Sequence, residues 1–168
     1  MSGYQTKIIR QLTGNNWITI VPTNVYGPND NFHPDHSHMI PGIIHRAHNC
    51  KQNNEDFVIW GDGSPLRQFI HSKDLAKVIL WAIDNWNSDV PFMAVNDNEH
   101  SVMDIVKIVA KKFDIQDDKL IFDETKPRGQ FRKPAKSDIP KDYQFINLEE
   151  GINKTIEWFI INYKTLRK

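Results

Sequence analysis

Residues 22–33, Pro-Thr-Asn-Val-Tyr-Gly-Pro-Asn-Asp-Asn-Phe-His, concentrate the residue types that could do chemistry. They follow residues 17–21, an apolar run that we predict to be a buried strand because aromatic and β-branched residues favour strands. In open α/β sheets, ligands bind beyond the carboxyl ends of the strands. The alternative is an ordinary loop, since Pro, Gly, Asn and Asp form turns in most proteins. We therefore treat this segment as the first candidate binding loop.

Histidines are clustered next to this loop. Five of the seven fall between residues 33 and 48: His33, His36, His38, His45 and His48. Two converging pairs could in principle bind zinc, but no Cys, Asp or Glu clearly completes a ligand set, so we predict no metal site. A single histidine acting as a proton donor is the favoured interpretation, because an unperturbed imidazole titrates near neutral pH.

Local positive charge could hold a phosphate-bearing ligand. Arg46 and Arg67 could each bind a diphosphate through paired hydrogen bonds, and residues 126–136 add further Lys and Arg side chains. The alternative is a solvated basic surface. Trp60 stands just before a glycine-containing turn, where an indole ring could stack on a base or a sugar. A core position is the alternative for Trp60.

Composition sets limits on the class of protein. A chain of 168 residues is the usual size of one domain, and 39% hydrophobic with 25% charged residues is typical of a globular fold. Lys+Arg and Asp+Glu are both 21, so no overall basic field favours nucleic acid. No apolar run approaches the roughly 18 residues of a membrane span. Cys50 is the only cysteine, which fits a cytoplasmic protein without disulfides.

Hydrophobic periodicity predicts a mixed α/β fold. We expect Ser72, Ser101 and Asn147 to cap three of the helices. We also expect the two strands on either side of residues 61–65 to be joined by that long turn. The predicted helices cover residues 4–12, 39–48, 72–86, 101–113 and 147–163, and the predicted strands cover residues 17–21, 57–60, 68–71, 92–95 and 120–122.

The combined motifs resemble those of the GDP-L-fucose synthase family of extended short-chain dehydrogenases/reductases. The match begins with Pro-Thr-Asn-x-Tyr-Gly-Pro at residues 22–28 and the downstream Asp-Asn-Phe at residues 30–32. It continues through Ser-His-Met-Ile-Pro at residues 37–41, Trp-Gly-x-Gly-x-Pro-x-Arg-x-Phe-Ile at residues 60–70, Ser-x-Asp-Leu-Ala at residues 72–76 and Leu-Glu-Glu-Gly at residues 148–151.

The resemblance implies an NADPH-dependent conversion of GDP-4-keto-6-deoxymannose, by epimerisation at two sugar carbons followed by hydride transfer to the keto carbon. His38 would protonate the sugar during epimerisation and would also lie near the cofactor. Asn24 would contact both cofactor and substrate. The remaining implied contacts are Pro22, Thr23 and Val25 to the nicotinamide side of NADP(H), and Arg46, Trp60 and Arg67 to the GDP group.

The resemblance also implies an incomplete enzyme. It predicts an α/β unit that is the family's C-terminal, substrate-binding part, with residues 1–36 as remnant Rossmann elements, residues 37–168 as the mainly substrate-binding region, and no glycine-rich NADP loop. The family's catalytic Ser, Tyr, Lys and Cys would then lie upstream of Met1. Alone, such a chain would bind a GDP-sugar but neither hold NADP(H) nor turn over.

One departure from the family's motifs and the expected incompleteness of the enzyme leave alternatives open. The family's Lys-Pro-Asp-Gly near the substrate is replaced at residues 126–129 by Lys-Pro-Arg-Gly, which removes an acidic contact. The expected partners are the missing Rossmann half or a second copy of this chain. The alternative functions are a non-catalytic sugar-nucleotide-binding or assembly module, and a part of another sugar-nucleotide epimerase.

Overall fold

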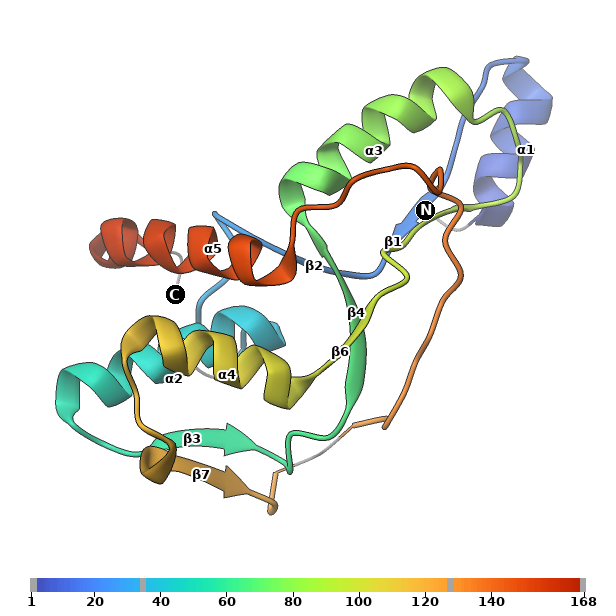
Figure 1. Ribbon diagram of the computed structural model, residues 1–168. Helices are drawn as coiled ribbons and strands as arrows, with labels where there is room; N and C mark the ends of the chain where they lie inside the picture. The colour runs from blue at the N-terminus through green and yellow to red at the C-terminus, as the bar shows by residue number, and fades with distance from the viewer. Residues whose placement is uncertain (1–2, 34–35, 127–128, 167–168) are drawn as a thin grey trace.

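The computed structural model describes residues 3–33, 36–126 and 129–166, which form two lobes. Each lobe has its own hydrophobic cluster. Strands β4 (Leu66–His71) and β6 (Glu99–Ser101) run between the lobes (Figure 1). The segment that follows residue 129 runs back along the same side, from the end of β7 to the smaller lobe.

The smaller lobe contains a short parallel sheet and two helices. Strand β1 (Ile20–Pro22) pairs with β5 (Phe92–Ala94), with Ile20 opposite Phe92. Helix α3 (Ser72–Asn85) covers one face of this sheet. Helix α1 (Gly3–Thr13) is attached to the start of β1 by a 2.6 Å hydrogen bond between the hydroxyl groups of Thr6 and Thr19, the residue before β1. The hydrophobic cluster of this lobe is formed by the buried residues Ile70, Val78, Ala82, Phe92, Ala94 and Ile139.

The larger lobe is built from three helices and a second parallel pair of strands. Its helices are α2 (Met39–Asn53), α4 (Val102–Phe113) and α5 (Leu148–Asn162), and its strands are β3 (Phe57–Trp60) and β7 (Leu120–Asp123). Two 3-10 turns, η1 (Asp117–Lys119) and η2 (Tyr163–Thr165), follow α4 and α5. Aromatic rings fill the centre, where Phe32 lies 4.9 Å from Phe159 between ring centroids.

A three-stranded sheet joins the lobes and carries the candidate binding loop. Its order is β2 (Asn24–Tyr26), β4, β6, with β2 parallel and β6 antiparallel to β4. Asn24 lies opposite Phe69 and Tyr26 opposite His71. The loop after β2 therefore leaves the carboxyl end of a parallel strand, as expected for a ligand-binding loop.

The mixed α/β pattern is confirmed, and the turn at residues 61–65 joins β3 to β4 as predicted. The two strands do not pair with each other. Strand β3 pairs with β7, in parallel, and the N–H group of Gly61 extends this pairing by donating to the Asp123 carbonyl at 2.9 Å. Gly61 and Gly63 both have positive φ angles, of 78° and 76°, which turn the chain away from a tight hairpin.

Two of the three predicted helix caps are confirmed. Ser101 forms a complete capping box with Asp104, and Asn147 accepts hydrogen bonds from the first N–H groups of α5. Ser72 is wrong as a cap, because His71 takes that position and its Nδ1 accepts from the Lys73 N–H group at 3.1 Å. His71 is still extended, with φ −71° and ψ 141°, and is the last residue of β4, so the strand passes directly into the helix.

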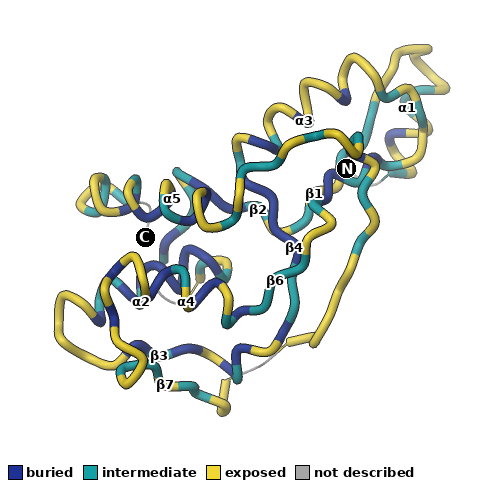
Figure 2. The backbone as a smooth tube through the Cα atoms, viewed as in Figure 1, coloured by how far each residue is buried: buried dark blue, intermediate teal, exposed yellow. Residues whose placement is uncertain are grey.

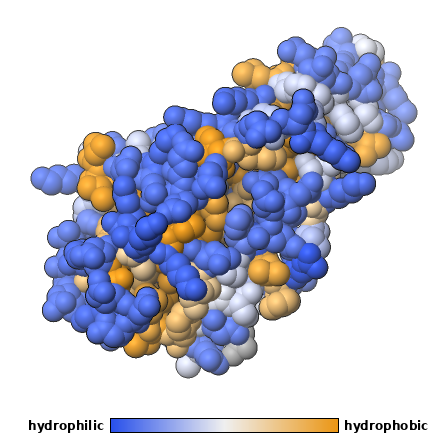
Figure 3. All heavy atoms as spheres, in the orientation of Figure 1, coloured by the Kyte–Doolittle hydropathy of each residue, from blue (hydrophilic) through white to orange (hydrophobic). Residues whose placement is uncertain are grey.

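The apolar side chains of α3 are only partly buried. Ala82 and Val78 lie in the core, but Ile79 and Ile83 are 36% and 56% exposed. Exposed residues dominate both α1 and α3 in Figure 2, and hydrophobic residues reach the surface of both lobes in Figure 3. No helix within the described ranges is long and apolar enough to cross a membrane.

Candidate functional site

The loop between β2 and α2 positions His38 as the residue that begins a helix. His38 is the N-cap of α2, and its carbonyl accepts from the Gly42 N–H group at 3.0 Å. Side chains hold the loop in shape: Asp30 Oδ1 accepts from the Asn31 N–H group at 2.7 Å, and Asn31 Oδ1 accepts from the His33 N–H group at 3.1 Å. The bond to Asn31 Oδ1 forms an Asx turn, which fixes a loop without regular secondary structure.

One small cavity, of about 90 Å³, brings together four of the residues predicted for the site. These are Asn24, Val25, His38 and Arg67, which come from β2, the N-cap of α2 and β4. The Asn24 amide donates to the Gln68 carbonyl at 2.8 Å, so its orientation is fixed by the neighbouring strand. The rest of the lining is mainly apolar: Tyr26, Met39, Ile40, Pro41 and Phe69.

His38 meets the solvent at the mouth of this cavity. Its side chain is 85% exposed, and its Nδ1 lies 4.0 Å from Oδ1 of Asp30, whose side chain is only 17% exposed. Burial raises the pKa of Asp30, while the hydrogen bond from Asn31 and the charge of His38 oppose that rise. An exposed imidazole beside a partly buried carboxylate can exchange protons with solvent and with a ligand.

Arg46 and Trp60 form a second part of the site. Arg46 is anchored by a 3.0 Å hydrogen bond from Nε to the Val58 carbonyl, and its Cζ lies 4.9 Å from the centre of the Trp60 ring. Trp60 is 40% exposed, so the core alternative for this residue is wrong. Burial lowers the pKa of Arg46, and Lys126 Nζ approaches the same ring at 5.8 Å.

The two parts meet at the N-terminal end of α2. A Cβ atom built on Gly42 would lie 3.2 Å from Nη1 of Arg46 and 2.7 Å from Oγ of Ser37, the residue before His38. The Arg46 guanidinium therefore folds back along α2 toward His38, as long helical side chains tend to do. The absence of a side chain at Gly42 provides the room for this.

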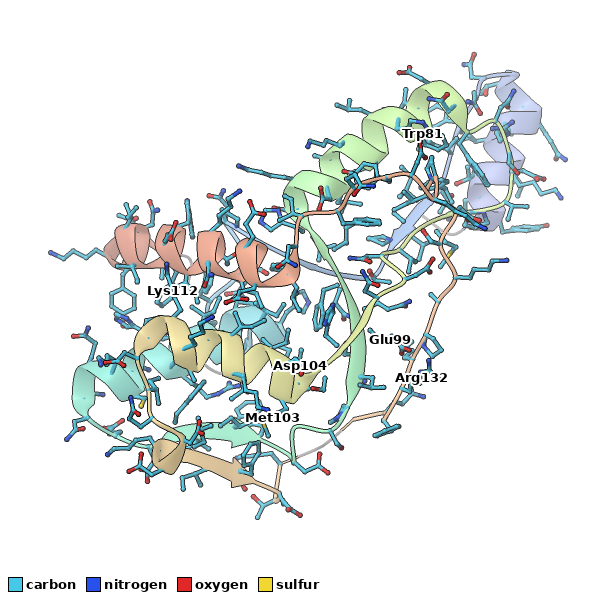
Figure 4. All side chains as sticks on the ribbon, viewed as in Figure 1. Trp81, Glu99, Met103, Asp104, Lys112 and Arg132 are labelled. Carbon is cyan, nitrogen blue, oxygen red and sulfur yellow. The ribbon has the colours of Figure 1, made fainter. Side chains whose placement is uncertain are left out.

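Arg46 and Arg67 carry charge that the described residues do not neutralise. Within the described ranges, no carboxylate lies within ion-pair distance of either guanidinium. Arg67 donates to the Leu66 carbonyl at 2.7 Å instead. Arg132 differs, because it pairs with Glu99 through two 2.9 Å bonds from Nε (Figure 4). Arg46 and Arg67 thus remain the cations best suited to a diphosphate.

The residues predicted to border a nicotinamide cofactor are suited to contact the nicotinamide end of that molecule. Pro22 and Asn24 are exposed at the end of β1 and the start of β2, and the buried Oγ1 of Thr23 has no hydrogen-bond partner among the described residues. A buried hydroxyl without a partner is costly, so a ligand that supplies one fits this position. The sequence contains no G-x-G-x-x-G to cradle a pyrophosphate.

Most of the clustered histidines serve the core or the loop. His45 is buried, with Nδ1 2.6 Å from the Phe32 carbonyl oxygen, and His48 packs 4.3 Å from Tyr163 between ring centroids. His33 and His36 contact each other. Among the residues the structure describes, no group of three His, Cys, Asp or Glu side chains could hold a metal ion.

Sequence reasoning missed three residues of the site. Asp30 was counted only as part of a motif, Gly42 was not singled out, and Lys126 was treated as part of a basic run. A carboxylate eight positions before the candidate acid, in a loop rich in Gly, Pro, Asn and Asp, is the signal that could have indicated Asp30. Arg128, the departure from the family's acidic contact, lies outside the described residues.

Comparisons with known proteins identify the relatives of this chain. The family model for the NAD dependent epimerase/dehydratase family matches residues 2–96. GDP-L-fucose synthase from Dictyostelium discoideum is 39% identical over 92% of this chain and 50% of its own length. GDP-L-colitose synthase from Yersinia pseudotuberculosis is 31% identical over 84% of this chain and 47% of its own length. The chain spans about half the length of these relatives.

Solved structures agree with the sequence matches. The crystal structure of a GDP-L-fucose synthetase from Naegleria fowleri bound to NADP superposes with a TM-score of 0.90. It is 32% identical to this chain, and the match covers 98% of this chain and 53% of that one. The arrangement of helices and strands described above is therefore that of a Rossmann-like α/β fold of the extended short-chain dehydrogenases/reductases.

These findings correct the expected placement of the chain within its family. The assignment to the C-terminal, substrate-binding part with only remnant Rossmann elements is wrong, because the epimerase/dehydratase model covers more than half of the chain, from residue 2 to residue 96. That match assigns these residues to the NAD-binding part of the fold. The error arose because the binding motifs between residues 37 and 76 were interpreted as a separate substrate-binding region, whereas they lie within one continuous family domain.

Proposed function

Because the chain belongs to the NAD-dependent epimerase/dehydratase family, we propose that it binds a GDP-sugar and contributes to a reaction like that of GDP-L-fucose synthase. The reaction would be epimerisation of a GDP-4-keto-6-deoxy sugar followed by NADPH-dependent reduction. The observation that supports this most is the pair of guanidinium groups, Arg46 and Arg67, without carboxylate partners among the described residues. A diphosphate would supply the missing negative charge.

Each residue of the site has a role in this proposal. Arg46, supported by Trp60, and Arg67 would hold the nucleotide diphosphate, so that the sugar reaches the cavity beside Asn24. The Asn24 amide keeps a carbonyl oxygen that can accept from a sugar hydroxyl. His38 would move the proton at the sugar carbon during epimerisation, because its imidazole is exposed at the mouth of that cavity.

The residues that would border the cofactor are Pro22, Thr23, Asn24, Val25 and His38. NADP(H), when bound, supplies the hydride for the reduction. This chain would orient the nicotinamide end through the exposed edge at Pro22 and Asn24 and through the Thr23 hydroxyl. Because the sequence has no glycine-rich pyrophosphate loop, we propose that the chain alone does not hold the cofactor tightly and does not turn over.

Isothermal titration of the chain with GDP-fucose and with GDP tests the proposal. We expect measurable heat for both ligands, and at least a tenfold weaker affinity for Arg46→Ala and for Arg67→Ala, since hydrogen bonds between charged groups contribute roughly 1.5–3 kcal/mol. Lys77→Ala is the matched control, because it removes one exposed positive charge on α3, in the other lobe. Equal affinities for all four proteins, or no heat with either ligand, would contradict GDP-sugar binding at this site.

A second candidate is another specificity within the same family. The relative from Yersinia pseudotuberculosis is named as a synthase of GDP-L-colitose, which supports a GDP-sugar while leaving the sugar open. A panel of GDP-, UDP- and dTDP-sugars in the same titration distinguishes these specificities. A non-catalytic binding module would bind the GDP-sugar yet show no NADPH oxidation with the keto sugar in the presence of a complementing partner chain.

A further inference from the structure

His38 has a neighbour whose geometry suggests a function in orienting it. Oδ1 of Asp30 lies 4.0 Å from Nδ1 of His38. This separation exceeds the roughly 2.7–3.2 Å of a hydrogen bond, but a modest rotation of the exposed imidazole could close it. Asp30 itself cannot follow easily, because its side chain is 17% exposed and Oδ1 already accepts from the Asn31 N–H group at 2.7 Å. The carboxylate is therefore the fixed member of the pair.

The backbone on both sides of the pair is also held. His38 is fixed as the N-cap of α2 by the Gly42 N–H group. Asn31 closes the intervening loop, with its amide donating to the His36 carbonyl at 3.1 Å. The His38 side chain, which is 85% exposed, is therefore the member of the pair with room to turn.

The Asp30 carboxylate lies where it can orient the His38 ring. A carboxylate that accepts from Nδ1–H of an imidazole leaves Nε2 facing away from that carboxylate. An acid that must give up and recover one proton at one atom requires such a fixed orientation.

We propose that Asp30 is a positioning residue that draws Nδ1–H of His38 toward its carboxylate and presents Nε2 of His38 to the ligand cavity. This inference rests on the proposed function, in which His38 is the proton donor. It concerns the orientation of the ring in the chain itself, however, and its test needs neither substrate nor cofactor. Failure of this test and failure of the proposed activity are therefore separate results.

Long-range ¹H–¹⁵N NMR correlations of the histidine rings, recorded on the full chain at a pH where the rings are neutral, identify the tautomer. We expect His38 to carry its proton mainly on Nδ1 in the wild type, whereas a free imidazole prefers Nε2–H. In Asp30→Asn the charge is removed while an oxygen remains for the Asn31 N–H group, and we expect His38 to return to the Nε2–H form.

His33 provides an internal control in the same spectra. Its Nδ1 accepts from the His36 N–H group at 3.2 Å, so its neutral ring carries the proton on Nε2 and should do so in both proteins. A His38 that is mainly Nε2–H in the wild type overturns the proposal without any variant. It is also overturned if His38 stays Nδ1–H in Asp30→Asn while His33 is unchanged. If His33 changes too, Asp30→Ser, which also keeps an oxygen acceptor, replaces the first variant and is judged by the same criteria.

Discussion

Gly42 is a residue whose missing side chain serves the ligand site more than the helix. Glycine within a helix costs roughly 1 kcal/mol relative to alanine. Here a Cβ atom would crowd Oγ of Ser37 at 2.7 Å and Nη1 of Arg46 at 3.2 Å. Both neighbours are ends of side chains that can move away. The substitution should therefore displace the Arg46 guanidinium while sparing the fold.

We predict that Gly42→Ala weakens GDP-fucose binding severalfold and leaves the free energy of unfolding equal or slightly higher. Titration calorimetry and urea denaturation measure the two quantities on the same protein. The opposite combination, unchanged binding with a loss of stability, would show that Gly42 serves packing alone. Arg46→Ala combined with Gly42→Ala provides the control, because the second substitution should have no further effect on binding once the guanidinium is gone.

Gly151 illustrates a different use of a missing side chain. It lies on α5 directly against Tyr26, and an added Cβ would overlap the Tyr26 hydroxyl and approach Cδ2 of His71 at 3.1 Å. Tyr26 is 3% exposed and cannot move into solvent without opening the core. Overpacking of this kind usually costs about 1–3 kcal/mol.

We predict that Gly151→Ala lowers the free energy of unfolding by about 1–3 kcal/mol and that Tyr26→Phe restores part of the loss, since it removes the overlapping oxygen. Urea denaturation of the wild type, both single variants and the double variant gives the coupling energy between the two positions. Additive effects in this cycle would refute the contact.

His71 links stability to pH. It is 2% exposed, and burial lowers its pKa below the ordinary value of 6.5. The unfolded chain therefore binds a proton more readily than the folded chain, and protonation favours unfolding. The contribution of His71 is complete above about pH 6.5 and is lost as the pH falls toward its folded-state pKa.

We predict that the free energy of unfolding decreases between about pH 6.5 and pH 5 and that His71→Asn makes this decrease smaller. Asparagine does not titrate and can still accept from the Lys73 N–H group as a helix cap. His36→Gln, at an exposed loop position, should keep the slope of the wild type. Urea denaturation over this pH range measures the slopes, and identical slopes for wild type and His71→Asn would contradict the linkage.

At the scale of elements, local chemistry predicted where helices begin but not how strands pair. Ser101 and Asn147 cap α4 and α5 through hydrogen bonds that span only a few residues, so the sequence pattern contains the whole interaction. The partner of β3 lies about sixty residues away in β7, and nothing in the local pattern of residues 57–60 specifies it. Parallel pairing depends on distant contacts, which periodicity does not encode.

The candidate site shows the same contrast between residues that local motifs identify and residues whose role depends on distant contacts. The motifs identified Asn24, His38 and Arg67, and the structure places all three around one cavity. Asp30 and Gly42 were missed because their importance comes from which side chain the fold brings beside them. The error in placing the chain within its family has a related cause, since single motifs do not show how far a domain extends, whereas the family match over residues 2–96 does.

In the smaller lobe, several apolar side chains beside the sheet of β1 and β5 are exposed among the described residues. The outer edge of β5 is occupied, because Met93 donates to the Asp138 carboxylate at 2.9 Å and accepts from the Asp138 N–H group at 3.0 Å. Among the described residues, β1 is therefore the edge of the β1–β5 sheet at which a further strand could pair. Nearby, Leu12 on α1 and Leu80 on α3 are 78% and 64% exposed. Parallel sheets are normally covered and extended on both sides.

We propose that a second copy of this chain covers this region. Leu80→Lys with Ile83→Lys should then lower the sedimentation coefficient at high concentration and change the free energy of unfolding by less than about 0.5 kcal/mol, since both side chains are exposed. Ile161→Lys is the control, because Ile161 is 82% exposed on α5 in the other lobe and should not affect association. A wild-type chain that stays monomeric at all concentrations would overturn this proposal.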